Sequence, residues 1–168
     1  LADPRRTTAA QRPARFLRIE KAVSLPDDDV RDFDNSAFGV TARFGMRELL
    51  GYAPVEPDGS VHVKVPADVP LAITVLDANG RRLSPRHENW LQVRAGEELR
   101  CNGCHDPASG QSHGRSNLFN AANAGATTTG QPFPNTSAAL FADFGETMAQ
   151  VRGALGLDYD RLLQRELQ

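Results

Sequence analysis

The sequence predicts an α+β fold in which an antiparallel β-sandwich is followed by a cysteine-containing segment, a long irregular wrap and one or two C-terminal helices. Three observations lead to this prediction. Short alternating runs separated by turn residues fill the first part of the chain, a stretch rich in Gly, Ala, Ser, Asn and Thr covers residues 106–135, and apolar residues then recur at helical spacing. We expect an N-terminal arm over residues 1–14, the sandwich over 15–100, and a C-terminal part over 101–168 that packs on the same domain.

Strands are expected in short runs between turns. Residues 15–23 and 61–65 alternate between apolar and polar side chains, whereas the runs at 49–53 and 71–76 are mainly apolar. Pro57-Asp58-Gly59 and Asn79-Gly80 separate them, and glycine supplies the positive φ that tight turns require. Short strands joined by such turns favour an antiparallel sandwich.

A further hairpin is expected to lead into the two cysteines. Residues 90–94 and 97–100 flank the turn pair Ala95-Gly96, so residues whose numbers sum to about 191 should lie opposite each other. The predicted pairs nearest the cysteines are Trp90 with Cys101 and His87 with Cys104.

The C-terminal third is expected to be helical. A helix should run from Asn135 or Thr136, both good N-caps, to about Leu155. Its apolar stripe consists of Phe141, Phe144, Met148, Val151 and Leu155. Asp158 should then cap a short second helix that carries Leu162, Leu163 and Leu167 on one side.

The segment Cys101-Asn102-Gly103-Cys104-His105 is the attachment signature of c-type haem. Both thiols bond to the porphyrin vinyl groups, and the adjacent histidine ligates the iron. The chain has no cysteines outside this motif. A redox dithiol, half of a zinc site and a plain disulfide are the alternatives; the first needs a βαβ context, the second two more ligands, and the third leaves His105 unexplained. The sequence therefore predicts one covalent haem c.

The sixth ligand of the iron decides whether the haem transfers electrons or binds small molecules. His113 lies in a polar turn eight residues after His105, a separation that can bring the chain around the porphyrin edge. Met148 is the second candidate, with core packing as its alternative; His62 and Met46 are expected to be structural. Around the haem we expect Trp90 at the macrocycle edge, His87 near the proximal edge, and Arg94, Arg100 and Arg115 as propionate donors.

Charge and hydropathy exclude two classes of partner. The net charge is -2 and the pI is about 6.1, which gives no electrostatic basis for nucleic-acid binding. No run of 18 apolar residues is present, so we expect no membrane insertion of this chain. Because covalent haem is attached outside the bacterial cytoplasm, we expect a periplasmic or secreted location. The chain begins at Leu1 without an export signal, so we expect a mature form or a fragment of a larger multidomain protein.

Three stretches before the cysteines resemble the hydrazine synthase alpha subunit middle domain and its bacterial relatives: LGYAPVEPDGS at residues 50–60, VPA at 65–67 and LQVRAGE at 91–97. The resemblance covers about residues 45–106. It implies a β-rich domain with one covalent haem, held by Cys101, Cys104 and His105, in a larger secreted multidomain protein. The family's haem has a tyrosine ligand four residues after the motif histidine, where this chain has Ser109. Serine offers no phenolate, so the resemblance does not imply hydrazine synthesis.

The predicted function is electron transfer. We expect a monohaem c-type cytochrome domain, with His105 and a second protein ligand, that passes single electrons to a redox partner protein or domain. We expect an electron-transfer module rather than a catalyst, although the sequence leaves enzymatic activity open. The alternative from another class is a haem enzyme or gas-binding site with an open distal position. A third is a haemless, adhesion-like sandwich with a disulfide between Cys101 and Cys104.

Overall fold

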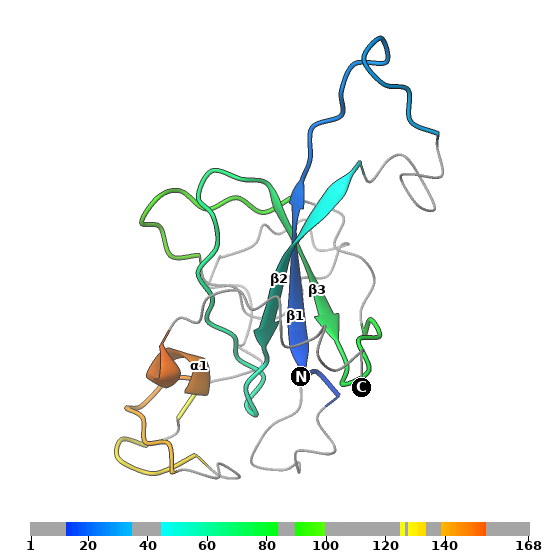
Figure 1. Ribbon diagram of the computed structural model, residues 1–168. Coiled ribbons are helices and arrows are strands. Elements are labelled where there is room, and N and C mark those ends of the chain that lie inside the picture. The colour runs from blue at the N-terminus through cyan, green and yellow to red at the C-terminus, as the bar shows by residue number, and fades with distance from the viewer. Residues whose placement is uncertain are drawn as a thin grey trace, which may run out of the picture.

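The centre of the structure is a three-stranded antiparallel sheet. The computed structural model describes residues 13–34, 45–83, 90–99, 125–126, 128–133 and 139–153. The sheet has the order β2-β1-β3 and consists of β1 (Phe16–Ala22), β2 (Arg47–Pro54) and β3 (Leu71–Leu76), and one helix, α1 (Met148–Arg152), lies near one end of it (Figure 1). The predicted strands at 15–23, 49–53 and 71–76 are therefore confirmed. The described residues hold this single sheet, and the second layer of a sandwich stays a prediction.

Strand β1 pairs on both of its edges. Arg18, for example, lies between Tyr52 of β2 and Thr74 of β3. A β-bulge interrupts the pairing with β2, because Ile19 pairs with Gly51 and Glu20 with Leu49. The bulge leaves Leu50 as an extra residue on β2. Leu50 therefore shares a buried cluster with Ile19.

The two faces of the sheet differ in chemistry because side chains alternate along each strand. The apolar face carries Ile19, Leu50 and Leu71 as buried residues. Partly buried side chains pack against these three: Leu17, Val63, Val65, Val69, Ile73 and Leu91. The opposite side, which we call the charged face, carries Arg18, Glu20, Arg47 and Thr74.

The strand predicted over residues 61–65 is wrong. This segment forms an isolated bridge at Val63 and ends at Pro66, which has no N–H to extend a ladder. Its alternation still has a structural meaning, because Val63 and Val65 contact the cluster on the apolar face. The periodicity identified the buried side chains but not the backbone pairing.

The predicted hairpin over residues 90–100 is confirmed at its turn and wrong in its described arms. Gly96 has a φ of 76°, and the Glu97 N–H donates to the Arg94 carbonyl over 3.0 Å. The residues on either side form no strand as far as the structure describes them, up to Leu99. Leu91 instead bridges Leu71, with two hydrogen bonds of 2.7 Å, and so adds to the edge of β3.

The helix predicted from residue 135 or 136 to 155 is wrong in extent. Residues 139–147 are not helical, and Phe141 forms an antiparallel bridge with Pro132. Gly145 has a φ of 84°, which a helix does not permit, and Thr147 then starts α1 with a capping box to Gln150. Phe144 of the expected stripe is 75% exposed. The second predicted helix, capped by Asp158, lies outside the described residues.

A close backbone approach explains one glycine of this region. Gly125 and Gly145 lie on two segments that run side by side, joined by hydrogen bonds from the Ala126 N–H to the Glu146 carbonyl and from the Gly145 N–H to the Ala126 carbonyl. A Cβ on Gly125 would collide with the Gly145 carbonyl oxygen. Glycine is therefore required at position 125 for steric reasons.

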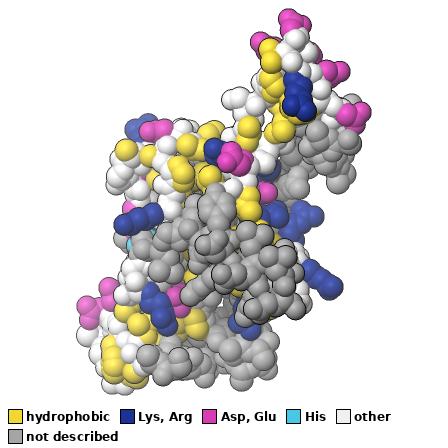
Figure 2. Space-filling view, viewed as in Figure 1, with side chains coloured by type: hydrophobic (Ala, Val, Ile, Leu, Met, Phe, Trp, Pro, Cys, Tyr) yellow, Lys and Arg dark blue, Asp and Glu magenta, His cyan; other side chains and the backbone are white. Residues whose placement is uncertain are grey.

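Residues 23–34 extend away from the sheet at the end opposite α1 (Figure 1). Acidic side chains gather on this extension, as Figure 2 shows in magenta. They belong to Asp27, Asp28, Asp29 and Asp32, all of which are exposed. The acidic run is thus a solvated loop.

Replacing Ile19 by alanine should destabilise the protein by about 2–5 kcal/mol, because a side chain that is 1% exposed would leave a cavity on the apolar face. Val30→Ala is the matched control, since Val30 is 77% exposed and should change stability by less than about 0.5 kcal/mol. Denaturant unfolding of both variants measures the difference. Equal stability of the two variants would contradict the assignment of this core.

Candidate functional site

Most of the predicted haem-site residues lie outside the described residues. These are His87, Arg100, Cys101, Cys104, His105, His113 and Arg115. The structure does describe Trp90, Arg94 and Met148. Among the residues that it describes, no group of three or more His, Cys, Asp or Glu side chains could hold a metal ion.

Ionic groups cluster on the charged face of the sheet. Glu20 forms an ion pair with Arg18, which lies two residues earlier on β1, with 3.5 Å between Arg18 Nη2 and Glu20 Oε1. Arg47 of β2 approaches the other oxygen, with 3.8 Å between Arg47 Nη1 and Glu20 Oε2. The Arg47 side chain is only 7% exposed, so a guanidinium group lies largely shielded from water. One carboxylate is therefore shared between two arginines.

Several polar atoms on this face are buried without forming hydrogen bonds. Within the described structure, Arg18 Nε, Glu20 Oε2 and Thr74 Oγ1 are buried without a hydrogen-bond partner. Thr74 is 2% exposed and lies directly opposite Arg18 in the pairing of β1 with β3. A buried polar group without a partner costs about 1–3 kcal/mol. The face therefore presents hydrogen-bonding capacity that the sheet itself does not use.

Trp90 lies against the same face. The Arg47 guanidinium sits 4.6 Å from the centroid of the Trp90 ring, a cation–π contact. Trp90 is 39% exposed, so part of this residue is accessible to solvent. This contact connects the segment before the cysteines to the charged face.

The other two described candidates are placed differently. Arg94 is exposed at the turn, where its N–H donates to Glu97 Oε2 over 2.8 Å. Met148 is fully buried in a second cluster, with Ala126, Phe133 and Ala142. These surroundings are those expected if Met148 has a packing role. Ligation of the haem iron by Met148 stays a prediction.

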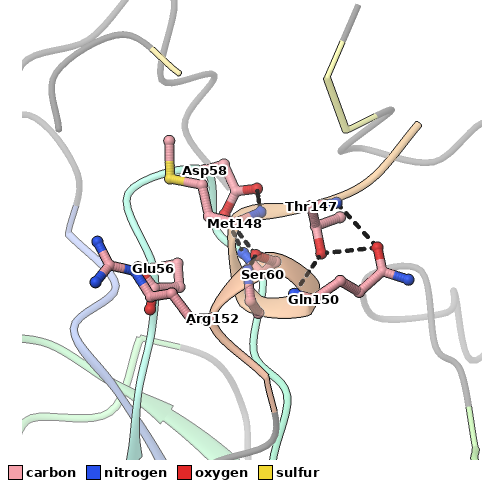
Figure 3. Close-up of polar contacts among 8 residues, drawn as sticks. Glu56, Asp58, Ser60, Thr147, Met148, Gln150 and Arg152 are labelled. Carbon is pink, nitrogen blue, oxygen red and sulfur yellow. Dashed lines mark hydrogen bonds and ion pairs between the residues drawn. The ribbon is translucent and has the colours of Figure 1, made fainter. Parts of the chain in front are cut away.

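A polar junction fixes α1 to the turn at residues 56–60 (Figure 3). Asp58 is 2% exposed, and its Oδ2 accepts the Met148 N–H over 2.9 Å. Its Oδ1 accepts the N–H and the hydroxyl of Ser60, and the Ser60 hydroxyl in turn accepts the Ala149 N–H over 3.0 Å. Thr147 accepts the Gln150 N–H. The first three N–H groups of the helix are thereby satisfied.

Glu56 adds an ion pair to this junction. Its Oε2 lies 3.1 Å from Arg152 Nε at the end of α1. Burial raises the pKa of the Glu56 carboxyl, and nearby Asp58 raises it further, whereas Arg152 lowers it. Burial is the largest of these effects, so the pKa lies above the ordinary value of 4.5.

Comparison with protein families matches residues 14–106 to the hydrazine synthase alpha subunit middle domain. The match covers more than half of the 168 residues. The chain belongs to this family. No curated protein and no solved structure matches it. The family match begins at buried Ala14, spans the whole described sheet, and extends through the C-x-x-C-H motif.

The sequence analysis did not predict the ionic cluster on the charged face of this family member. Arg18 and Glu20 occupy alternate positions of β1, and a charged residue at such a position is ordinarily solvent-exposed. The signal available was that Thr74, in the apolar run at 71–76, shares its face with Ala72 and Leu76, both buried. That pattern indicates burial on both faces of β3.

The described part of the domain contains no helix that is long and apolar enough to cross a lipid bilayer.

Replacing Asp58 by alanine should lower the free energy of unfolding by about 1–3 kcal/mol, because the Met148 N–H and Ser60 lose a buried acceptor. The same variant should be cleaved faster within residues 139–153 in limited proteolysis. Asp29→Ala, on the exposed extension, is the matched control and should behave as the unmodified chain. Unchanged stability and unchanged cleavage of Asp58→Ala would refute the junction.

Glu56 should make stability depend on pH with a defined sign. Because its pKa is raised in the folded state, the folded chain binds this proton more tightly than the unfolded chain. The unfolding free energy of the wild type, minus that of Glu56→Gln, should therefore fall as the pH rises above 4.5. Denaturant unfolding of both proteins over a pH series measures this difference, and a difference that rises with pH would contradict the effect.

Proposed function

We propose that this chain is an extracytoplasmic monohaem c-type cytochrome domain that transfers single electrons to a partner domain or protein. The observation that carries the proposal is the Cys101-Asn102-Gly103-Cys104-His105 motif, which lies inside the family match and contains every cysteine of the chain. Two thiols spaced by two residues, followed by an imidazole, form the donor set that covalent haem attachment uses.

The surroundings of the motif support the same function. Leu91 is held at the edge of β3 by its bridge to Leu71, and the Asp68 N–H donates to the Val93 carbonyl over 2.8 Å. The turn at Ala95-Gly96 follows, and the motif begins five residues after that glycine. A segment anchored to a sheet can present a cofactor in a fixed position.

Haem c supplies a one-electron iron couple, and the chain would supply the rest. Cys101 and Cys104 would attach the porphyrin, and His105 would ligate the iron. The polarity around the iron and its second axial ligand would set the potential. Covalent attachment outside the cytoplasm supports a periplasmic or secreted location, and the family, a middle domain of a subunit, supports a place in a larger protein.

One observation favours the alternative, a haem enzyme or gas-binding site with an open distal position. Met148, a candidate for the sixth ligand, packs in an apolar cluster with Phe133, and its backbone N–H is held by Asp58. A methionine in this position would have to leave that cluster to reach a haem. His113 is then the remaining candidate for a second strong ligand.

Export of the chain in a bacterial host with the cytochrome c maturation system should yield one covalent haem per chain, measured as a pyridine haemochrome. Cys101→Ala combined with Cys104→Ala should abolish covalent haem. His62→Ala is the matched control, because His62 is a described histidine outside the motif, and it should retain full haem content. Wild-type chain without covalent haem would overturn the proposal.

The spin state of the ferric protein separates the two functional classes. A low-spin spectrum that His113→Ala converts to high spin supports electron transfer with His113 as the second ligand. A high-spin wild type that binds CO rapidly when reduced supports the open-site alternative. Met148→Leu keeps the volume of the apolar cluster and should leave the spectrum unchanged unless Met148 is the ligand.

A further inference from the structure

We propose that Asn79 is a site of deamidation, a covalent modification that requires only water. Asn79 lies in the turn that follows β3 (Figure 1), and Gly80 is the next residue. The Gly80 nitrogen attacks Asn79 Cγ, so that an N–C bond forms, the bond from Cγ to Nδ2 breaks, and ammonia leaves with the proton of the nitrogen. Water then opens the succinimide ring at either carbonyl group and gives aspartate or isoaspartate. The inference goes beyond the proposed function, since it does not require haem.

The amide that is attacked is open to water. Asn79 is an exposed residue of the turn. Its backbone N–H donates to Asp77 Oδ1 over 2.8 Å, whereas its side-chain amide has no hydrogen-bond partner within the described residues. Solvent can therefore take up the leaving ammonia and supply the water for hydrolysis.

The attacking nitrogen is weakly held. Gly80 has no Cβ beside this nitrogen, and its φ of 75° is a conformation that glycine adopts without strain. The Gly80 N–H donates to the Asp77 carbonyl over 3.2 Å, at the long limit of roughly 2.7–3.2 Å for such bonds. The Asp77 N–H closes the same turn on the Arg81 carbonyl over a shorter distance, 2.9 Å. Breaking the long bond frees the nitrogen and leaves the closing bond in place.

A second turn shows that the fold, and not the residue pair alone, selects the site. Asp58-Gly59 can form the same succinimide with loss of water, and Gly59 likewise has a positive φ, of 85°. Asp58, however, is only 2% exposed. Its carboxylate accepts hydrogen bonds from Ser60 and from the Met148 N–H. The reactive group of this turn is therefore closed to water and engaged, in contrast to Asn79.

Isoaspartate at position 79 would alter the turn. It adds one methylene group to the main chain between two residues that the turn holds in register. Asp77 closes the turn through its N–H to the Arg81 carbonyl and through Oδ1, which accepts the Arg81 N–H over 2.8 Å. We expect the lengthened backbone to disrupt this closure. Trypsin should then cut the native chain faster after Arg81.

Peptide mapping of the full chain tests the proposal. The folded chain is incubated in mildly alkaline buffer, digested with trypsin and analysed by mass spectrometry, with an unincubated sample as reference. The peptide Val65–Arg81 should gain aspartate and isoaspartate at Asn79. Asn89 is the internal control, because bulky Trp90 follows it in the peptide His87–Arg94. Asn79 should react about tenfold faster than Asn89 or more, which is a barrier lower by about 1.4 kcal/mol.

Two further comparisons isolate the role of the fold. In the folded chain the peptide Glu48–Lys64, which contains Asp58, should stay unmodified, and denaturant should allow isoaspartate to form there. Asn79→Gln should abolish the reaction in the turn, because glutamine must close a larger ring, and native cleavage after Arg81 should then not change with incubation time. A Val65–Arg81 peptide that stays unmodified, or that reacts no faster than Asn89, would overturn the proposal. Equal reaction of Asp58 and Asn79 in the folded chain would also overturn it.

Discussion

The pairing of β1 on both of its edges is the constraint on which the described structure depends. A central strand has each residue fixed by two neighbours, so its alternation defines the chemistry of both faces of the sheet. Ile19 directs one face toward an apolar cluster, whereas Arg18 and Glu20 give the other face its ionic character. The bulge opposite Ile19 places Leu50 in the same cluster. Displacing β1 by one residue would exchange the two faces and bury charge in the core.

A buried carboxylate performs the second organising role. Asp58 lies 90 residues before Met148 in sequence, yet its carboxylate accepts the first N–H of α1. A five-residue helix is too short to be stable alone, so it depends on these contacts and on the apolar packing of Met148. The turn at residues 56–60 thus serves two purposes, since it reverses the chain after β2 and provides the cap for a distant helix.

The ionic groups of the charged face depend on the same register. Glu20 of β1 lies between Arg18 and Arg47 of β2, and the Arg47 guanidinium in turn contacts the Trp90 ring. Trp90 belongs to the segment that precedes the C-x-x-C-H motif in the chain. The strand pairing therefore fixes the surroundings of this tryptophan as well as those of the core.

Local chemistry determined a definite part of this protein. The alternation at residues 15–23 predicted β1, and the β-rich run at 71–76 predicted β3. The turn at Ala95-Gly96 follows from its glycine, and C-x-x-C-H predicts a haem without reference to any fold. Tertiary structure decided what depends on distant partners. Residues 61–65 have the alternation of a strand, yet they contribute side chains to the core and form no strand. The helical spacing after residue 135 predicted a longer helix than α1, because Gly145 has a backbone conformation that a helix does not permit and Asp58 caps the helix only at Met148. The burial of Arg18 Nε beside Thr74 could not be predicted from the sequence either, because alternation shows that a strand has two faces but not what covers each of them.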